Sequence, residues 1–147
     1  GFAVDSSEMF ISVGDTNADE FMDFYYRTDG KLEAFSRDGG VNQWDLKTDN
    51  PIFTNESQSK YTHVALVQNG TAPVFYVNGE LAASTLTITT DTTDWMATLT
   101  GLDNVRIGTL NKNSAGETNH FDGSMLDARI YNRALTAEEV GMLYKSY

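Results

Sequence analysis

The sequence predicts an all-β protein: two antiparallel β-sheets packed face to face as a sandwich, followed by one short C-terminal helix. Its 147 residues are 40% hydrophobic and 12% aromatic, and Val, Ile, Thr, Tyr and Phe prevail over helix formers. Short apolar runs end at Asp-Gly or Asn-Gly pairs, which are typical of hairpin turns. A chain of this length can bury one core without disulfides, so we expect residues 1–147 to form a single domain.

The first strands are predicted from runs that stop at turn residues. Residues 9–13 read Met-Phe-Ile-Ser-Val and end at a Gly-Asp pair. Residues 21–27 and 32–36 flank Asp29 and Gly30, a pair that readily adopts the positive φ angles of a tight turn. These two runs should therefore form a hairpin.

A second hairpin is expected in the middle of the chain. Residues 61–68 form an apolar run, and residues 73–77 lead into Asn78 and Gly79 before the chain returns through residues 80–83. An Asn-Gly pair between two apolar runs is a strong short-range hairpin signal.

Three further strands are expected at residues 86–90, 105–108 and 125–131. Residues 91–94 are polar and read as a loop. Residues 111–119 lack apolar periodicity, so we expect an exposed loop there, where binding residues are often found.

One helix is predicted near the C-terminus. Thr136 followed by Glu139 fits a capping box, in which each side chain bonds the backbone N–H of the other residue. Leu135 and Val140 have the spacing of a hydrophobic staple across the first turn. The helix should begin after Thr136 and pack one face on the sandwich.

The order of these segments resembles the laminin G-like (jelly roll) family of the concanavalin A-like lectin/glucanase superfamily. Four stretches carry the resemblance: residues 61–67 (YTHVALV), 74–81 (VFYVNGEL), 105–108 (VRIG) and 121–139 (FDGSMLDARIYNRALTAEE). The resemblance implies a jelly-roll sandwich that works as a non-catalytic carbohydrate-binding, lectin-like or adhesion module. It also implies earlier N-terminal strands that this sequence lacks, so a neighbouring segment or chain is expected to cover an open sheet edge.

Charge and composition exclude several partners and fit the implied location. Twenty-one acidic residues against ten basic ones give a net charge of −11, which would repel a nucleic-acid backbone. No apolar run is long enough to insert into a membrane. The expected partners are a glycan or a surface protein, and the implied location is extracellular, on a cell surface or on a virion.

Carboxylates offer candidate calcium ligands, because calcium prefers oxygen donors. Asp15 and Asp19 lie in the oxygen-rich loop 14–19, although turn-forming side chains explain the same pattern. Asp122 and Asp127 are alternatives, and Asp127 could instead pair with Arg129. The resemblance implies an acidic pair at residues 126 and 127, of which only the second position is acidic here.

No catalytic pattern stands out in the sequence. Hydrolases of this fold carry acidic residues at alternate positions of one strand, and no Glu-x-Asp-x-Glu run occurs. His63 has no nucleophile-elbow motif near it and fits a structural histidine. We therefore expect a protein that is not an enzyme.

Sugar recognition needs aromatic faces and planar polar groups. Trp44 and Trp95 each follow a polar loop and are candidate platforms, although a place in the core fits either tryptophan equally well. The candidate polar contacts to a glycan are Asn111, Asn113, Asn119 and His120.

Two hypotheses follow. The first is a glycan-binding or adhesion module. The second is a structural or decoration domain in a larger assembly such as a virus particle, which predicts tryptophans in the core or an interface and no concave pocket.

Overall fold

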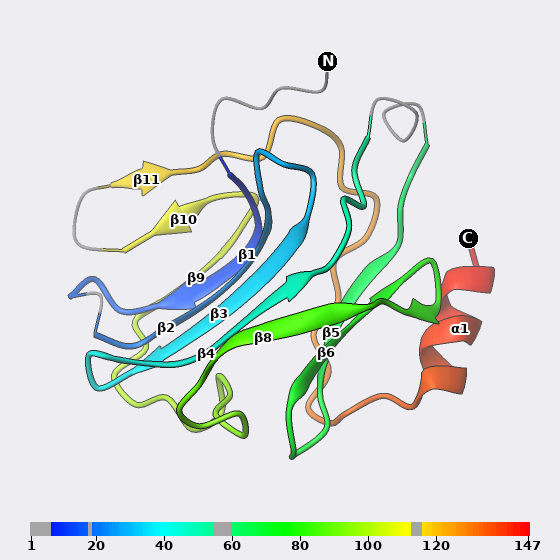
Figure 1. The fold of residues 1–147 in the computed structure, drawn as a ribbon. Helices are drawn as coiled ribbons and strands as arrows, with labels where there is room; N and C mark the ends of the chain where they lie inside the picture. The colour runs from blue at the N-terminus through cyan, green and yellow to red at the C-terminus, as the bar shows by residue number, and fades with distance from the viewer. Residues whose placement is uncertain (1–6, 18, 55–59, 113–115) are drawn as a thin grey trace.

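The computed structural model describes residues 7–17, 19–54, 60–112 and 116–147. Two antiparallel sheets of six and three strands face each other, with a short third ribbon beside them and the helix at the far end (Figure 1). The strands are β1 (Glu8–Gly14), β2 (Phe21–Tyr26), β3 (Leu32–Asp38), β4 (Val41–Thr48), β5 (Val64–Gln68), β6 (Pro73–Val77), β7 (Glu80–Leu81), β8 (Ser84–Thr89), β9 (Asn104–Ile107), β10 (Leu110–Asn111) and β11 (Glu117–Thr118), and the helix is α1 (Ala137–Lys145). The predicted β-sandwich with a C-terminal helix is confirmed.

The larger sheet has the strand order β8-β4-β3-β2-β1-β9, with antiparallel pairing throughout. Alternate side chains of a strand point to opposite faces of its sheet. In β2, Met22, Phe24 and Tyr26 belong to the hydrophobic core. The alternate residues of β2, beginning with Phe21, therefore occupy the outer face.

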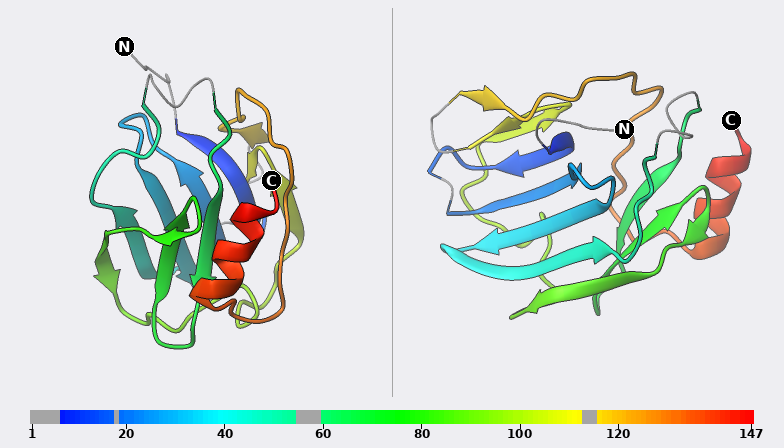
Figure 2. Two further views of the ribbon diagram at one scale, coloured as in Figure 1. Left: turned by 90° about the vertical axis from the view of Figure 1, so that its right-hand side faces the viewer. Right: turned by 45° about the horizontal axis from the view of Figure 1, so that its top comes forward.

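The smaller sheet has the order β5-β6-β7 and covers the core from the other side (Figure 2). Phe75 of β6 is fully buried in the main core. On the opposite face of this sheet, Val67 and Tyr76 form a second cluster with Val140 of α1. The helix therefore covers the outer face of the smaller sheet, and no helix in the described part of the chain is long and apolar enough to cross a membrane.

Both predicted hairpins and the predicted helix start are confirmed. Gly30 has a φ of 79° in the β2–β3 turn, and Asn78 and Gly79 have φ values of 50° and 81° between β6 and β7. At the helix start, the Glu139 amide donates to Thr136 Oγ1 at 3.2 Å and the Thr136 amide donates to a Glu139 carboxylate oxygen at 2.9 Å. The capping box thus forms as the sequence indicates.

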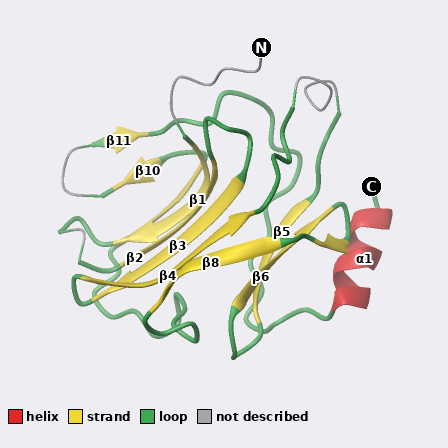
Figure 3. Ribbon diagram, in the orientation of Figure 1, coloured by secondary structure: helices red, strands yellow, loops and turns green. Residues whose placement is uncertain are grey.

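Three segments differ from expectation. Residues 125–131 form no strand, so that prediction is wrong, and Figure 3 shows the segment as loop. Residues 111–119 were expected to be entirely loop, yet they contribute to the β10–β11 ribbon. Strand β4 was not predicted, because the glycines before it and its polar first half hide its alternation.

Candidate functional site

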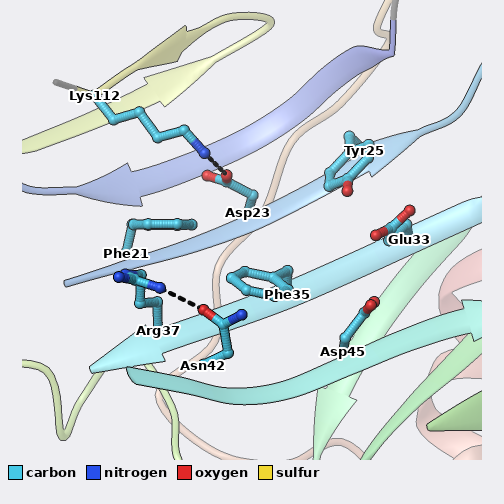
Figure 4. A pocket seen from close by; sticks show the side chains of 9 residues that line it. All are labelled: Phe21, Asp23, Tyr25, Glu33, Phe35, Arg37, Asn42, Asp45 and Lys112. Carbon is cyan, nitrogen blue, oxygen red and sulfur yellow. Dashed lines mark hydrogen bonds and ion pairs between the residues drawn. The ribbon is translucent and has the colours of Figure 1, made fainter. Parts of the chain in front are cut away.

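A groove of about 500 Å³ lies on the outer face of the larger sheet (Figure 4). Strands β2, β3 and β4 form its floor, and one side chain reaches in from the end of β10. Its lining residues are Phe21, Asp23, Tyr25, Glu33, Phe35, Arg37, Asn42, Asp45 and Lys112. We call this site the groove.

Strand registers align the floor of the groove in rows, because directly paired residues share a face of the sheet. Across β2, β3 and β4 the rows are Phe21, Arg37 and Asn42; Asp23, Phe35 and Asp45; and Tyr25, Glu33 and Lys47. An aromatic ring therefore occupies the middle of the floor, with one carboxylate on each neighbouring strand.

Phe35 supplies that central ring. It is half-buried and stacks against Phe21, with ring centres 5.7 Å apart and planes 26° from parallel. The Lys112 ammonium lies 4.1 Å from the centre of the Phe21 ring, within the range of a cation–π contact. These contacts fix Phe35 from one side.

Asp23 is almost fully buried beside Lys112. Its side chain is 4% exposed, and Lys112 Nζ lies 3.4 Å from Asp23 Oδ2. Burial raises the pKa of the Asp23 carboxyl, and the nearby Lys112 ammonium offsets only part of that rise. Asp23 thus holds its proton more tightly than an exposed aspartate does.

Asp45 has one occupied and one free carboxylate oxygen. Its Oδ2 accepts hydrogen bonds from Lys47 Nζ at 2.7 Å and from Thr87 Oγ1 at 2.8 Å. Its Oδ1 is buried and accepts no hydrogen bond from the residues that the structure describes. A buried acceptor without a donor is costly, so this oxygen has room in its bonding for a donor from water or from a ligand.

Glu33 is held by two cations. Arg27 Nη1 lies 2.6 Å from one carboxylate oxygen, and Lys47 Nζ lies 3.5 Å from the other. Burial, together with this carboxylate, raises the pKa of the neighbouring Tyr25 hydroxyl. Burial lowers the pKa of Lys47, but hydrogen bonds and charge from Asp45 and Glu33 outweigh it, so the net shift is upward. The charged side chains at this end of the groove therefore form ion pairs with one another.

Arg37 is different, because its guanidinium is not matched to a carboxylate. Nη1 donates to Asn42 Oδ1 at 2.6 Å, and no ion pair forms between Arg37 and an acidic side chain within the described ranges. A guanidinium carries five N–H donors, so Arg37 can also bind an acceptor or an anionic group of a ligand.

The structure places the two tryptophans on the other side of the larger sheet. Trp44 is 0% exposed, and its indole N–H donates to the Asp94 carbonyl at 2.8 Å. A side chain without exposed surface offers no face to a sugar, so Trp44 as a surface platform is wrong. Trp95 is half-buried and stacks on Trp44, with ring centres 6.3 Å apart. Trp95 lies outside the groove, and its role in binding stays a prediction.

The predicted polar contacts Asn111, Asn119 and His120 also lie outside the groove lining. Asn119 has a φ of 53° and donates through its amide to the Ser7 carbonyl at 2.9 Å, which is a structural role. Asn111 lies in β10 opposite Glu117, and His120 is exposed. Asn113 lies outside the described residues. Their contact with a ligand stays a prediction.

The candidate calcium ligands do not converge. Asp15 Oδ1 accepts a hydrogen bond from the Asp19 amide at 3.0 Å, as turn-forming aspartates do. Asp127 pairs with Arg129 at 2.7 Å, and the Asp122 amide donates to Glu8. Within the described ranges, no group of three or more His, Cys, Asp or Glu side chains is placed to hold an ion. Calcium binding stays an untested expectation.

Sequence reasoning missed the groove because its residues come from three separate strands. A search for paired carboxylates along one strand cannot find Asp23 and Asp45, which lie on β2 and β4 with β3 between them. One signal was present: residues 21–26 alternate between core residues and the series Phe21, Asp23 and Tyr25. That alternation indicates a strand whose outer face carries aromatic and acidic side chains, as a binding surface does, in place of the charged side chains of an ordinary exposed face.

Comparison with known proteins agrees with this fold. A family model described as the concanavalin A-like lectin/glucanases superfamily matches residues 2–141, while no curated protein matches the sequence. Among solved structures, the CBM40 module of the Ruminococcus gnavus IT-sialidase matches in its complex with α2,3-sialyllactose (22% identity, TM-score 0.76) and in its complex with α2,6-sialyllactose (21%, 0.75). These matches cover 98% of this chain and 76% and 77% of the two modules, respectively. Because the family model covers nearly the whole sequence, this chain belongs to the concanavalin A-like lectin/glucanases superfamily.

Proposed function

We propose that this chain is a non-catalytic carbohydrate-binding module that holds a glycan in the groove. A sugar ring would lie over Phe35, with a hydroxyl group donating to the carboxylate of Asp45. The Ruminococcus gnavus modules of the same fold bind sialyllactose, which supports a glycan as the ligand class.

The observation that carries the proposal is the free Oδ1 of Asp45 beside Phe35. Sugars present C–H faces that pack on aromatic rings and hydroxyl groups that need acceptors. The groove offers both within one row of the sheet. An apolar ligand would leave the buried carboxylate oxygen without a donor, so a polyhydroxylated ligand fits best.

Arg37 and Asn42 extend the proposal to acidic glycans. Sialic acid carries a carboxylate, and the guanidinium of Arg37 is the cation of the groove that has no acidic partner among the described side chains. We infer that a sialylated glycan directs its carboxylate to this end of the groove. The acidic floor then contacts hydroxyl groups rather than the charged group.

The same proposal places the module in an extracellular or surface-attached protein. Glycans with terminal sialic acid are displayed outside cells, and the net charge of −11 suits a soluble surface. Fractionation of the native host, with detection of the protein in the medium, on the cell surface or inside the cell, tests this location.

Glycoside hydrolysis is the competing function, because the raised pKa of Asp23 is a property of a general acid. The pairing through β3 puts Asp23 and Asp45 two strand spacings apart, roughly 10 Å between backbones. Inverting hydrolases use carboxyl groups at a comparable separation. However, the whole Asp23 residue is 3% exposed and its carboxylate faces Lys112. This leaves little surface for contact with a glycosidic oxygen. Binding without turnover is therefore favoured.

The structural or decoration alternative predicted tryptophans in the core and no concave pocket. The burial of Trp44 agrees with it, and the groove counts against it. The groove supports the binding module over the structural domain, since a purely structural surface needs no concave site.

The proposal is tested with a glycan array followed by isothermal titration calorimetry on the best ligands. Wild type should bind, and Phe35→Ala should weaken binding about tenfold or more through the loss of the stacking face. Tyr61→Ala is the matched control, because Tyr61 is an exposed aromatic residue outside the groove. No binding by wild type, or equal binding by Phe35→Ala, would overturn the proposal, and release of reducing sugar would replace it with hydrolysis.

A further inference from the structure

Asp23 lines the groove, but the proposed function gives its carboxylate no contact with the ligand. The side chain is 4% exposed and belongs to the outer face of β2. A carboxylate removed from solvent is costly to ionise, and burial raises the pKa of the Asp23 carboxyl. Asp23 is therefore a buried titratable group inside a binding site, and its charge depends on what the site holds.

The other two carboxylates of the groove floor have closer partners than Asp23 has. Glu33 and Asp45 each accept a hydrogen bond from a cationic side chain, at 2.6 and 2.7 Å respectively. Among the described residues, Asp23 forms one ion pair, in which Lys112 Nζ lies 3.4 Å from Oδ2 (Figure 4). Its Oδ1 accepts no hydrogen bond from the same set of residues. The negative charge of Asp23 is thus the least stabilised of the three.

The surroundings of Asp23 carry charges of both signs. The residues directly opposite it are uncharged: Ser12 on β1, whose hydroxyl makes no hydrogen bond with a described residue, and Phe35 on β3. Neither histidine of the chain is among the residues that line the groove. The charged or titratable side chains around Asp23 on this face are Tyr25 on β2, Glu33 and Arg37 on β3, Asp45 and Lys47 on β4, Lys112 after β10, and Arg106 on β9, which pairs with Glu117 of β11.

Arg37 is the diagonal neighbour of Asp23 on the next strand. Asp23 pairs with Phe35, and Arg37 lies two residues further along β3, so both side chains share the outer face. Side chains in this relation have Cβ atoms roughly 7–8 Å apart. An anion bound by Arg37 is therefore brought close to the Asp23 carboxylate, in a groove where solvent screens charge only partly. The two negative charges repel each other, and protonation of Asp23 removes that repulsion.

We propose that Asp23 is a proton-linked regulator of the groove: an acidic glycan binds together with a proton, which the Asp23 carboxylate takes up. The inference rests on the proposed function, because it needs a ligand whose carboxylate lies at Arg37. The proton comes from solvent and bonds to a carboxylate oxygen, and no other covalent bond changes. A neutral glycan binds without proton uptake.

The direction of the pH effect follows from linkage between proton and ligand. The bound anion raises the pKa of Asp23 further, so the complex holds more protons than the free protein at pH values between the two pKa values. Affinity for an acidic glycan therefore increases as pH falls through that interval and is level above and below it. Arg37 keeps its charge over the whole interval, since a guanidinium does not deprotonate in this range.

Isothermal titration calorimetry between about pH 5 and pH 8 tests the inference with α2,3-sialyllactose and lactose. The affinity of the wild type for sialyllactose should rise about tenfold towards the acidic end, the size expected for two like charges at this separation, while lactose binding stays constant. Titrations at one pH in two buffers of different ionisation enthalpy count the protons directly. They should show uptake with sialyllactose and none with lactose, and they need no variant.

Substitutions assign the proton to Asp23. Asp23→Asn should bind sialyllactose with an affinity that no longer depends on pH and that matches the acidic limit of the wild type. Lys112→Met should move the pH response upward by about one pH unit, because the ammonium lowers the pKa of Asp23, and Lys112→Arg should restore it. Asp49→Asn, at an exposed aspartate outside the groove, should keep the wild-type response. Thermal denaturation confirms that each variant is folded.

The outcomes separate this inference from the proposed function. Sialyllactose binding by the wild type without a pH response or proton uptake would overturn the inference and leave the proposed function in place. No binding at any pH would overturn both. A pH response that persists in Asp23→Asn would place the proton on another group, which also contradicts the inference.

Discussion

Asp45 stands directly opposite Phe35 in the register of β3 and β4. The carboxylate therefore borders the aromatic ring at the centre of the groove, and its Oδ1 accepts no hydrogen bond from the described residues. In the proposed function, this pairing of a flat apolar surface with an unused buried acceptor is what binds a polyhydroxylated ring.

Asp45→Asn should weaken glycan binding about 10- to 100-fold, because it replaces a charged acceptor with a neutral amide of the same shape. Isothermal titration calorimetry with α2,3-sialyllactose measures the change. Asp49→Asn is the control, since Asp49 is exposed beyond the end of β4. Unchanged affinity in Asp45→Asn would remove this residue from the site.

Arg37→Gln should lower the affinity for α2,3-sialyllactose about tenfold and leave lactose binding unchanged, because only the first ligand has a carboxylate. Titration of both sugars measures the difference. Arg129→Gln serves as control, since Arg129 pairs with Asp127 away from the groove. An equal loss of affinity for both sugars would show that Arg37 does not bind the carboxylate of the sialic acid.

Trp44→Phe should leave glycan affinity unchanged, because Trp44 lies on the core side of the larger sheet. Trp44→Ala should lower the free energy of unfolding by about 3–5 kcal/mol through the cavity it creates. Urea denaturation measures the second effect and titration the first. A folded Trp44→Phe protein that no longer binds would restore Trp44 as a ligand contact.

Asp23→Asn should change how stability depends on pH. The pKa of Asp23 is raised in the folded protein, so the folded state binds the proton more tightly than the unfolded state. Its contribution to stability therefore falls as pH rises from the ordinary value of 3.8 through the raised pKa. Asparagine does not ionise, so the stability of the variant relative to wild type should increase over that window. Urea denaturation across pH measures this, and parallel curves for the two proteins would contradict it.

Thr136→Ala should lower the free energy of unfolding by about 1 kcal/mol, because it removes one half of the capping box at the start of α1. Thr136→Ser keeps the hydroxyl group and should retain most of the stability. Thermal and urea denaturation measure both variants. Equal stability of the alanine and serine variants would mean that the cap contributes nothing.

Local chemistry explains what the sequence could predict. The turns at Asp29-Gly30 and Asn78-Gly79 and the cap at Thr136 depend on neighbouring residues alone, and all three form as expected. The superfamily was also recognisable, since the order of the segments is a property of the sequence.

Tertiary context decides what the sequence could not predict. Residues 125–131 have the composition of a strand, but a strand also needs a partner, and no backbone group of the described residues pairs with this segment. The sequence around Trp44 fits a core and a surface site equally well, and only the register that places Trp44 opposite Ser36 buries it. The groove depends on three strands coming into register, which no local pattern reveals.

The most direct test of glycan binding in the groove is a ¹H–¹⁵N NMR titration of the 147-residue chain with α2,3-sialyllactose. Saturable shift changes should be concentrated in β2, β3 and β4, with the largest at Phe35, Arg37 and Asp45. Shift changes confined to the loop around Trp95 or to α1, or no change at millimolar ligand, would contradict the account.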